Sequence, residues 1–502
     1  MVFSSLEFIY LFLPPVLIGY LVLRHWGWEN GIIWWLTIAS LVFYAWWTPV
    51  YLPLLLGSVV INYGFHRVLR KVRDKFILIT GIVFNLALIA VFKYADFFIG
   101  NANLVAGTDI PMLNLVLPLA ISFFTFQQIS FLIDTYKGDI IKCDFGRYML
   151  FVVFFPQLIA GPIVMQKETI PQFKLPVFRN KLALNLAIGG TLFAIGLFKK
   201  IVLADGIAPY ANQVFSLAET TNGVPLEAAW IGALAYTFQL YFDFSGYCDM
   251  ALGLARLFGI RLPVNFNSPY KATSISDFWR RWHITLSHFL RDYLYIPLGG
   301  NRSGPIRRYS NLMITMLLGG LWHGASWTFV FWGGLHGAYL AINHGWDALS
   351  KKGYVPNILP RPVGNLLSRG ITLLAVVVAW VFFRAESFTG ASNIIHGMTG
   401  FSTVYEPKLW EGALTGTMQV WAMMVALAAI VFLLPNAIEF TEKYNPVLGL
   451  KKLVAQRRSE GFLPVRWQPT TGWALGVSVL FGLALIQTYR LAEMTEFIYF
   501  NF

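Results

Sequence analysis

Apolar segments follow one another from residue 8 to residue 486 with no polar module between them, and this pattern limits the fold more than any other feature. Hydrophobic residues make up 57% of the 502 residues and charged residues only 13%, whereas soluble domains carry about 25% charged residues. We therefore predict an all-α polytopic membrane protein in which residues 1–502 form a single membrane domain. The apolar runs allow about twelve crossings, with re-entrant segments in addition.

The formal net charge of +13 reflects the membrane topology of the chain and does not indicate nucleic-acid binding. They gather in short loops between apolar runs, as they do in the cytoplasmic loops of membrane proteins. The predicted loop 66–75 holds five of them, and residues 439–468 form a second basic segment. Counting crossings from these loops puts both termini outside the cytoplasm. The N-terminus lacks the features of a removable signal peptide, and Cys143 and Cys248 lack the spacing of a zinc site or a disulfide.

Two segments are unusually polar for membrane depth. Residues 154–165 contain two prolines, a glutamine and a glycine within an apolar run. Non-helical backbone at this depth is tolerated only inside protein or beside a wet cavity, so we expect a broken or re-entrant helix facing the site.

The run 228–258 contains Asp243 and Asp249, which lie about 240° apart around a helix and cannot face one partner. Bonding to neighbouring helices is the alternative to a functional role for Asp243.

The stretch 277–337 concentrates the chemistry of the chain. Its first half, DFWRRWHITLSHFLRDYLYIPLGGNR, sets arginines and histidines among aromatic residues. Its second half, NLMITMLLGGLWHGASWTFVFWGGLHG, is apolar and long enough to cross a bilayer as one helix, yet it carries His323 and His336. An ionisable group in such a segment is a functional hypothesis by default, and a hydrogen-bonded core histidine is the alternative. Glycines on both sides of His323 would let backbone or substrate approach closely.

The spacing of the histidines argues against a metal site. His283 and His288 are five residues apart, and His323 and His336 are thirteen apart, so neither pair has the i, i+4 geometry of a helical metal-binding pair. The sequence also lacks the G-x-S-x-G motif of a serine hydrolase. The remaining chemistry is general-base catalysis on a hydroxyl by a histidine in a water-poor tunnel.

The chain resembles the membrane-bound O-acyltransferases, most closely the bacterial branch of the alginate O-acetylation protein. The resemblance rests on the central stretch, the segment QLYFDFSGYCDMALGLA and the N-terminal MVFSS and FYAWW. The resemblance covers essentially the whole chain. It implies a ring of tilted helices around a thinned centre pierced by a tunnel, and transfer of acyl groups onto hydroxyls of polymers outside the cytoplasm. In that family the histidine of the WHG motif is catalytic, which corresponds to His323. The histidine of the WRRWH segment, His283, is a second candidate.

The resemblance also implies an acyl thioester donor, acetyl-CoA or an acyl carrier, that enters from the cytoplasm, with no bound cofactor. Arginines near the site, including Arg302, could hold the donor phosphates, although snorkelling or loop anchoring is an equal alternative for each. The candidate residues for substrate or donor binding are Trp279, Arg280, Arg281, Trp282, Arg291, Trp322 and Asp243.

The C-terminal TEFIYFNF resembles the motif that ends the small single-span peptides partnering the teichoic-acid D-alanylation acyltransferase. Here such a peptide would be fused as residues 470–502, a final span with an extracytoplasmic tail. The motif tyrosine, thought to carry the acyl group in that system, corresponds to Tyr499. Only about 0.1% of tyrosine is phenolate at pH 7, and a neutral histidine can take the proton as attack proceeds. An aromatic interfacial anchor is the alternative.

These features predict a bacterial inner-membrane enzyme that moves acetyl groups outward for O-acetylation of a secreted or cell-wall polysaccharide. Its expected partners are the donor, the polysaccharide, membrane lipids and a periplasmic acetyltransferase or esterase-like protein, but no nucleic acid. One alternative is a transporter or flippase for a lipid-linked saccharide, with the histidines as proton relays. Another is a scaffold that only recruits a periplasmic acetyltransferase. The inverted repeats of many transporters are not visible in the sequence.

Overall fold

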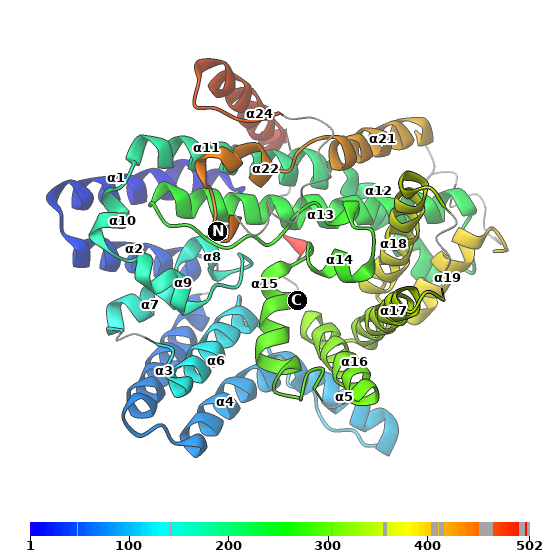
Figure 1. Ribbon diagram of the computed structural model, residues 1–502, viewed down its shortest axis with the longest axis horizontal. Helices are drawn as coiled ribbons and strands as arrows, with labels where there is room; N and C mark the ends of the chain where they lie inside the picture. Colours follow the sequence, from blue (N-terminus) through cyan, green and yellow to red (C-terminus); the bar gives the residue numbers. More distant parts are fainter. Residues whose placement is uncertain are drawn as a thin grey trace.

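The computed structural model describes residues 1–47, 49–140, 143–302, 304–354, 359–402, 410, 416–450, 465–490 and 497–498. Its elements are helices, and the β contact within this part of the chain is an isolated bridge between Pro263 and Leu448. The prediction of an all-α protein is therefore confirmed. Helix α13 (Leu226–Leu257) crosses the middle of the view in Figure 1, with α14 (Ile275–Trp279) and α15 (Ile284–Leu290) beside it and the other helices around this centre.

The N-terminal quarter is a series of helices joined by short turns, apart from the longer non-helical stretch 107–120 before the last of them. The helices are η1 (Glu7–Phe12), α1 (Leu13–Trp26), α2 (Glu29–Ala45), α3 (Leu52–Val72), α4 (Lys75–Ile89), η3 (Ala90–Tyr94), α5 (Ala95–Ala106) and α6 (Ile121–Lys137).

The predicted basic loop 66–75 is mostly helical, because α3 continues to Val72. Lysine and arginine favour helix formation, and their charges are stabilised at a helix C-terminus. The turn after α3 is short: Arg73 takes the left-handed conformation that ends the helix. The Asp74 side chain then accepts from the amides of Phe76 and Ile77 at the start of α4.

Helix α13 is the centre of the packing. It is mainly apolar and buried along nearly its whole length, as expected for a helix surrounded by protein. Its 32 residues span about 48 Å, more than the hydrocarbon core of a bilayer. A continuous helical stretch packs along it, formed by α11 (Leu182–Phe198), η5 (Lys199–Ala204) and α12 (Asp205–Thr220).

The predicted broken helix at 154–165 is confirmed. The chain leaves α7 (Phe145–Val153), makes the single turn α8 (Phe155–Leu158), and continues without regular structure to residue 165. Pro156 and Pro162 interrupt the helix because proline lacks an amide donor. The segment is buried, and its Ile163 amide donates to the Thr285 hydroxyl at 3.0 Å. It therefore lies against the central stretch, as predicted.

The apolar second half of the central stretch is a hairpin, so the prediction of one helix through it is wrong. Helix α16 (Gly304–His323) ends at His323, and α17 (Trp327–Lys351) begins after Ser326, whose hydroxyl accepts from the Thr328 amide at 3.3 Å. The serine cap satisfies one of the free amides at the start of α17. The two helices pack together (Figure 1). They touch closely at Gly320 and Gly333, where an added Cβ would lie 2.2 Å from a backbone oxygen of the facing helix.

The C-terminal part adds α18 (Arg361–Arg384), α19 (Phe388–Thr399), α21 (Thr417–Leu433), α22 (Ala437–Thr441) and α24 (Thr471–Arg490). Among the described residues, six helices are long and apolar enough to cross a membrane, or seven if the bent pair of α21 with the segment from Ala437 to Tyr444 is one span. The chain is thus a multi-pass membrane protein. The count of about twelve crossings and the side on which each terminus lies stay predictions.

Candidate active site

His323 lies at the C-terminal end of α16 and is surrounded by aromatic rings. Its side chain is buried, and its ring meets those of Trp332 and Phe383 edge to face, each at a centroid distance of 5.1 Å. Trp322 lies beside it at 4.9 Å. These rings exclude water from the imidazole, which strengthens any electrostatic interaction that it makes.

His283 also lies near Trp322, with 6.1 Å between the centroids of the two rings. The structure therefore brings the two candidate catalytic histidines to one indole. His283 is buried and has a left-handed backbone, with φ of 42°. Non-glycine residues in this region often mark functional sites.

The protonation of His283 follows from its hydrogen bond. Nδ1 is 3.1 Å from Asn265 Oδ1, and this oxygen also accepts from the Thr285 amide and hydroxyl. A carbonyl oxygen only accepts, so Nδ1 carries the proton and donates it. In the neutral ring Nε2 then holds the lone pair, which is the form a general base requires.

Two side chains of the π-helical turn η3 hold the end of α16 that carries His323. Lys93 Nζ donates to the Trp322 carbonyl, and the Tyr94 hydroxyl donates to the Leu321 carbonyl at 2.9 Å. The last carbonyls of a helix lack partners within the helix, and a cation there is stabilised by the helix dipole. These contacts fix the backbone immediately before His323.

Trp322 offers a hydrogen-bond donor to a ligand. The residue is buried, and its Nε1 has no hydrogen-bond partner among the residues that the structure describes. A buried donor without a partner costs about 1–3 kcal/mol. A ligand oxygen bound next to Trp322 would satisfy this donor.

Trp279, Trp282 and His336 form a packed aromatic group next to this site. Trp279 Nε1 donates to His336 Nδ1 at 3.3 Å. Trp282 is buried and packs against Trp380, with ring centroids 4.9 Å apart. His336 is thus a hydrogen-bonded core histidine, the alternative considered for it from the sequence.

A cavity of about 350 Å³ lies on the arginine-rich side of α15. Arg280, Arg291 and His288 line it, with Thr285 deeper in the lining. Because Thr285 and His283 share Asn265 as a partner, the cavity reaches the neighbourhood of His283.

The predicted donor-binding arginines fall into two groups. Arg280 and Arg291 are exposed and line the cavity, although Arg291 also pairs with Asp292 at 2.7 Å. Arg281 is buried and binds Asp277 at 2.9 Å, so its charge is compensated within the protein.

Asp243 and Asp249 face different lysines, as their spacing predicts. On η5, Lys199 binds Asp249 at 2.6 Å and Lys200 binds Asp243 at 2.8 Å. Lys200 also binds Asp205 at 2.7 Å. All of these groups are buried or nearly so, where charges persist only when paired.

Asp243 also binds the C-terminal tail. Its Oδ2 accepts from the Ile498 amide at 3.1 Å, and Phe497 stacks on Tyr247 at a centroid distance of 4.5 Å. Tyr247 also stacks on the N-terminal Phe3 at 4.8 Å. Both chain ends therefore meet at α13. Tyr499 lies outside the described residues.

Several residues of this site escaped the sequence reasoning. Lys93 and Tyr94 stand in an apolar segment that gave no sign of contact with α16, and Asn265 stands in an irregular loop. A lysine inside an apolar helix is a signal that could have identified Lys93. Within the described ranges, no three His, Cys, Asp or Glu side chains are arranged to hold a metal ion.

Comparison with known proteins places this architecture in a family. Residues 139–357 match the membrane-bound O-acyltransferase family. The chain is 44% identical over 435 residues to a peptidoglycan O-acetyltransferase of Helicobacter pylori, an alignment covering 80% of this chain and 81% of that protein. It is 38% identical over 515 residues to a probable alginate O-acetylase of Pseudomonas putida, which covers 100% of both. It is 29% identical over 236 residues to a teichoic acid D-alanyltransferase of Streptococcus thermophilus, covering 45% of this chain and 57% of that protein.

The family predicted from the sequence is confirmed by these matches. The matched segment contains both candidate histidines, Trp322, and the two arginines that line the cavity. Acyl transfer is thereby favoured over the flippase and the non-catalytic scaffold. The chain belongs to the membrane-bound O-acyltransferase family and is a multi-pass membrane enzyme.

Proposed function

We propose that this enzyme takes acetyl groups from a cytoplasmic thioester and moves them across the bacterial inner membrane for O-acetylation of a secreted or cell-wall polysaccharide. Two relatives are named for O-acetylation, of peptidoglycan and of alginate, which supports both the acyl group and the class of acceptor. In this proposal both termini lie outside the cytoplasm, and a periplasmic acetyltransferase or esterase-like protein completes the transfer.

The arginine-lined cavity is the proposed entrance for the donor. Arg280 and Arg291 bind its phosphates, since guanidinium groups match phosphate oxygens in charge and geometry. The thioester end then extends past Thr285 toward His283. The contacts of Thr285 and His283 with the same Asn265 oxygen support this path.

One observation carries the proposal: the described end of the tail lies next to the histidine site. Phe497 packs against Phe244 at a centroid distance of 5.6 Å, and Phe244 packs against His283 at 4.9 Å. The Ile498 amide binds Asp243. Tyr499 follows directly, and consecutive Cα atoms are only about 3.8 Å apart. This supports Tyr499 as the acyl carrier.

In this reaction His323 first accepts a proton from Tyr499 and then donates it to the leaving thiolate. The Tyr499 oxygen attacks the thioester carbonyl while His323 takes the phenol proton. Trp322 Nε1 donates to the carbonyl oxygen as negative charge develops there. The carbon–sulfur bond breaks, the thiolate receives the proton from His323, and an acetyl ester remains on Tyr499. A hydroxyl of the partner or the polymer then accepts the acetyl group and restores the phenol.

The variant Tyr499→Phe tests the carrier, because it keeps the ring and removes only the oxygen. We expect no polymer acetylation, with unchanged protein level and membrane insertion. Mass spectrometry of the wild-type enzyme incubated with donor but without acceptor should find an acetyl group on Tyr499. Normal acetylation by Tyr499→Phe would eliminate the carrier and leave direct transfer through His323.

The variant His323→Gln tests the base. It should abolish acetylation while the protein still inserts, whereas near-normal acetylation would remove His323 from the reaction. Purified wild-type enzyme should transfer acetyl from a thioester without a proton gradient. Gradient-dependent movement of a lipid-linked sugar in liposomes would instead favour the flippase.

A further inference from the structure

A second cavity lies at the C-terminal end of α3. It shares no lining residue with the arginine-lined cavity near His283. Its volume is about 400 Å³. Residues at positions 63, 66, 67, 70 and 71 line one wall, and their spacing of three and four puts them on one face of the helix. Cys143 and Asp144, at the start of α7, line the opposite wall.

Three cations of this wall have no acidic partner among the described residues. Arg67, Arg70 and Lys71 are exposed, and none of them forms an ion pair with another described residue. Cations arranged around a concave site attract an anion more strongly than the same cations on a flat surface, because the low-dielectric walls focus their field.

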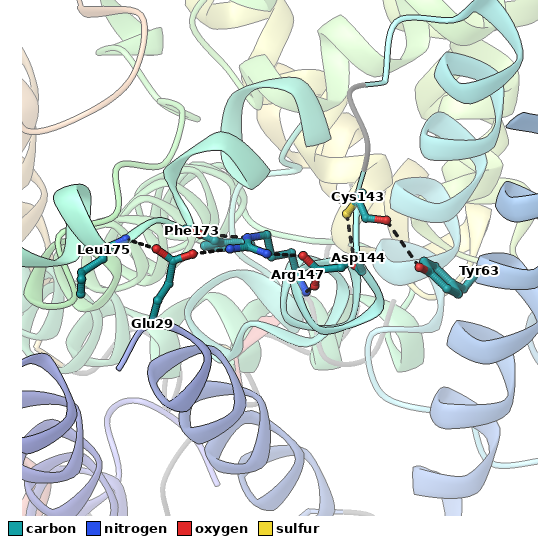
Figure 2. Close-up of polar contacts among 7 residues, drawn as sticks. All are labelled: Glu29, Tyr63, Cys143, Asp144, Arg147, Phe173 and Leu175. Carbon is teal, nitrogen blue, oxygen red and sulfur yellow. Dashed lines mark hydrogen bonds and ion pairs between the residues drawn. The ribbon is translucent and has the colours of Figure 1, made fainter. Parts of the chain in front are cut away.

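The acidic residue of the cavity is already paired with a cation. Asp144 pairs with Arg147, which also pairs with Glu29 (Figure 2). The Arg147 Nε donates to the Phe173 carbonyl at 3.2 Å, and Glu29 accepts from the Leu175 amide at 2.7 Å.

This network holds the Asp144 carboxylate in place. Burial opposes its ionisation, but the hydrogen bonds and charge of Arg147 outweigh that effect, so the pKa of Asp144 is lowered. Arg147 holds this carboxylate in place, and the three cations on α3 outnumber it, so the charged groups of the lining leave an excess of positive charge.

His66 adds a buried polar atom to the same cavity. Its side chain is 1% exposed and lines the cavity. Nδ1 lies 2.8 Å from the Thr135 hydroxyl, whose single proton goes to the Phe131 carbonyl at 2.8 Å. Nδ1 must therefore donate to Thr135, and in the neutral ring Nε2 is an acceptor. No described residue binds Nε2.

We infer that this cavity binds the phosphate ester of a polyol, such as glycerol phosphate, either as the headgroup of an anionic phospholipid or as a soluble compound. The phosphate would bind Arg67, Arg70 and Lys71, and a polyol hydroxyl would donate to His66 Nε2. Val60, one turn before Tyr63 on the same helix, is exposed, so a lipid chain can cover the surface beside the cavity. Basic pockets between membrane helices commonly bind anionic headgroups.

The test uses the purified full-length protein in phosphatidylcholine nanodiscs. Phosphatidylglycerol is added to the bilayer in one series and soluble glycerol phosphate in another, and binding is followed by native mass spectrometry. The variant Arg67→Gln/Arg70→Gln changes two exposed side chains and leaves the core intact. The control Arg73→Gln/Lys75→Gln removes the same charge from the adjacent turn, whose residues do not line the cavity.

We expect the cavity variant to weaken binding by about fivefold for each cation lost, and the control to leave it nearly unchanged. Loss confined to the phosphatidylglycerol series identifies a lipid headgroup, and loss confined to the glycerol phosphate series identifies a soluble ligand. Equal losses of binding in the variant and the control would show that binding depends on general surface charge, and would overturn the inference. Absence of binding in both series would also overturn it.

Discussion

The close crossing of α16 and α17 should make the position of His323 sensitive to one methyl group. In Gly320→Ala, the new Cβ would lie 2.2 Å from the Phe329 carbonyl oxygen, whereas ordinary contacts begin near 3.4 Å. The obstacle is backbone, so rotating a side chain cannot relieve it. The helices must separate by about 1 Å, and a displacement of this size at a catalytic group can cost about 100-fold in rate.

The neighbouring Gly334 provides a matched control. A Cβ added there would lie 3.5 Å from the Leu317 side chain, which is an ordinary contact. We expect Gly334→Ala to retain acetyl transfer, because the same chemical change on the facing helix α17 meets no backbone.

The assay is single-turnover acetyl transfer from a thioester by purified protein, with thermal unfolding measured in parallel. We expect Gly320→Ala to lose about 100-fold in rate, with stability lowered by about 1–3 kcal/mol, the usual cost of overpacking. Full transfer by Gly320→Ala, or an equal loss in Gly334→Ala, would refute the role assigned to this crossing.

Three further predictions concern groups around the histidines. Lys93→Met should slow acetyl transfer and Lys93→Arg should recover part of it, because the cation holds the Trp322 carbonyl; equal rates for both variants would argue against this contact. Trp322→Phe keeps a ring but removes the indole donor, so the rate should fall about 100- to 1,000-fold, and a rate within twofold of wild type would exclude the donor. Asp243→Asn should lower stability by about 3–5 kcal/mol, as breaking a buried ion pair does, and should also slow transfer because Asp243 binds the tail. The control Asp249→Asn should lower stability without slowing transfer, and matching kinetic losses would contradict tail positioning by Asp243.

The sequence was sufficient for the class of fold. The recurrent apolar runs excluded a soluble protein, the prolines around residue 160 predicted a broken helix, and the six-residue spacing of Asp243 and Asp249 predicted separate partners. These properties depend on composition and on local backbone geometry, which a single sequence records directly. The boundary of the basic segment after α3 was less accurate, because lysine and arginine are compatible with both a loop and the last turns of a helix.

The arrangement of the site depended on contacts between residues far apart in the chain. The sequence pointed to His323 and His283 through the motifs around them, but not to Trp322 as a ring that contacts both. The turn that divides α16 from α17 also went unrecognised, because a long apolar run is compatible with one membrane helix or with two packed ones. Lys93 reaches the Trp322 carbonyl across 229 residues, and the Ile498 amide reaches Asp243 across 255. Such pairs leave no periodic signal in the sequence; they form because buried carbonyls and carboxylates must find partners wherever the packing brings them together.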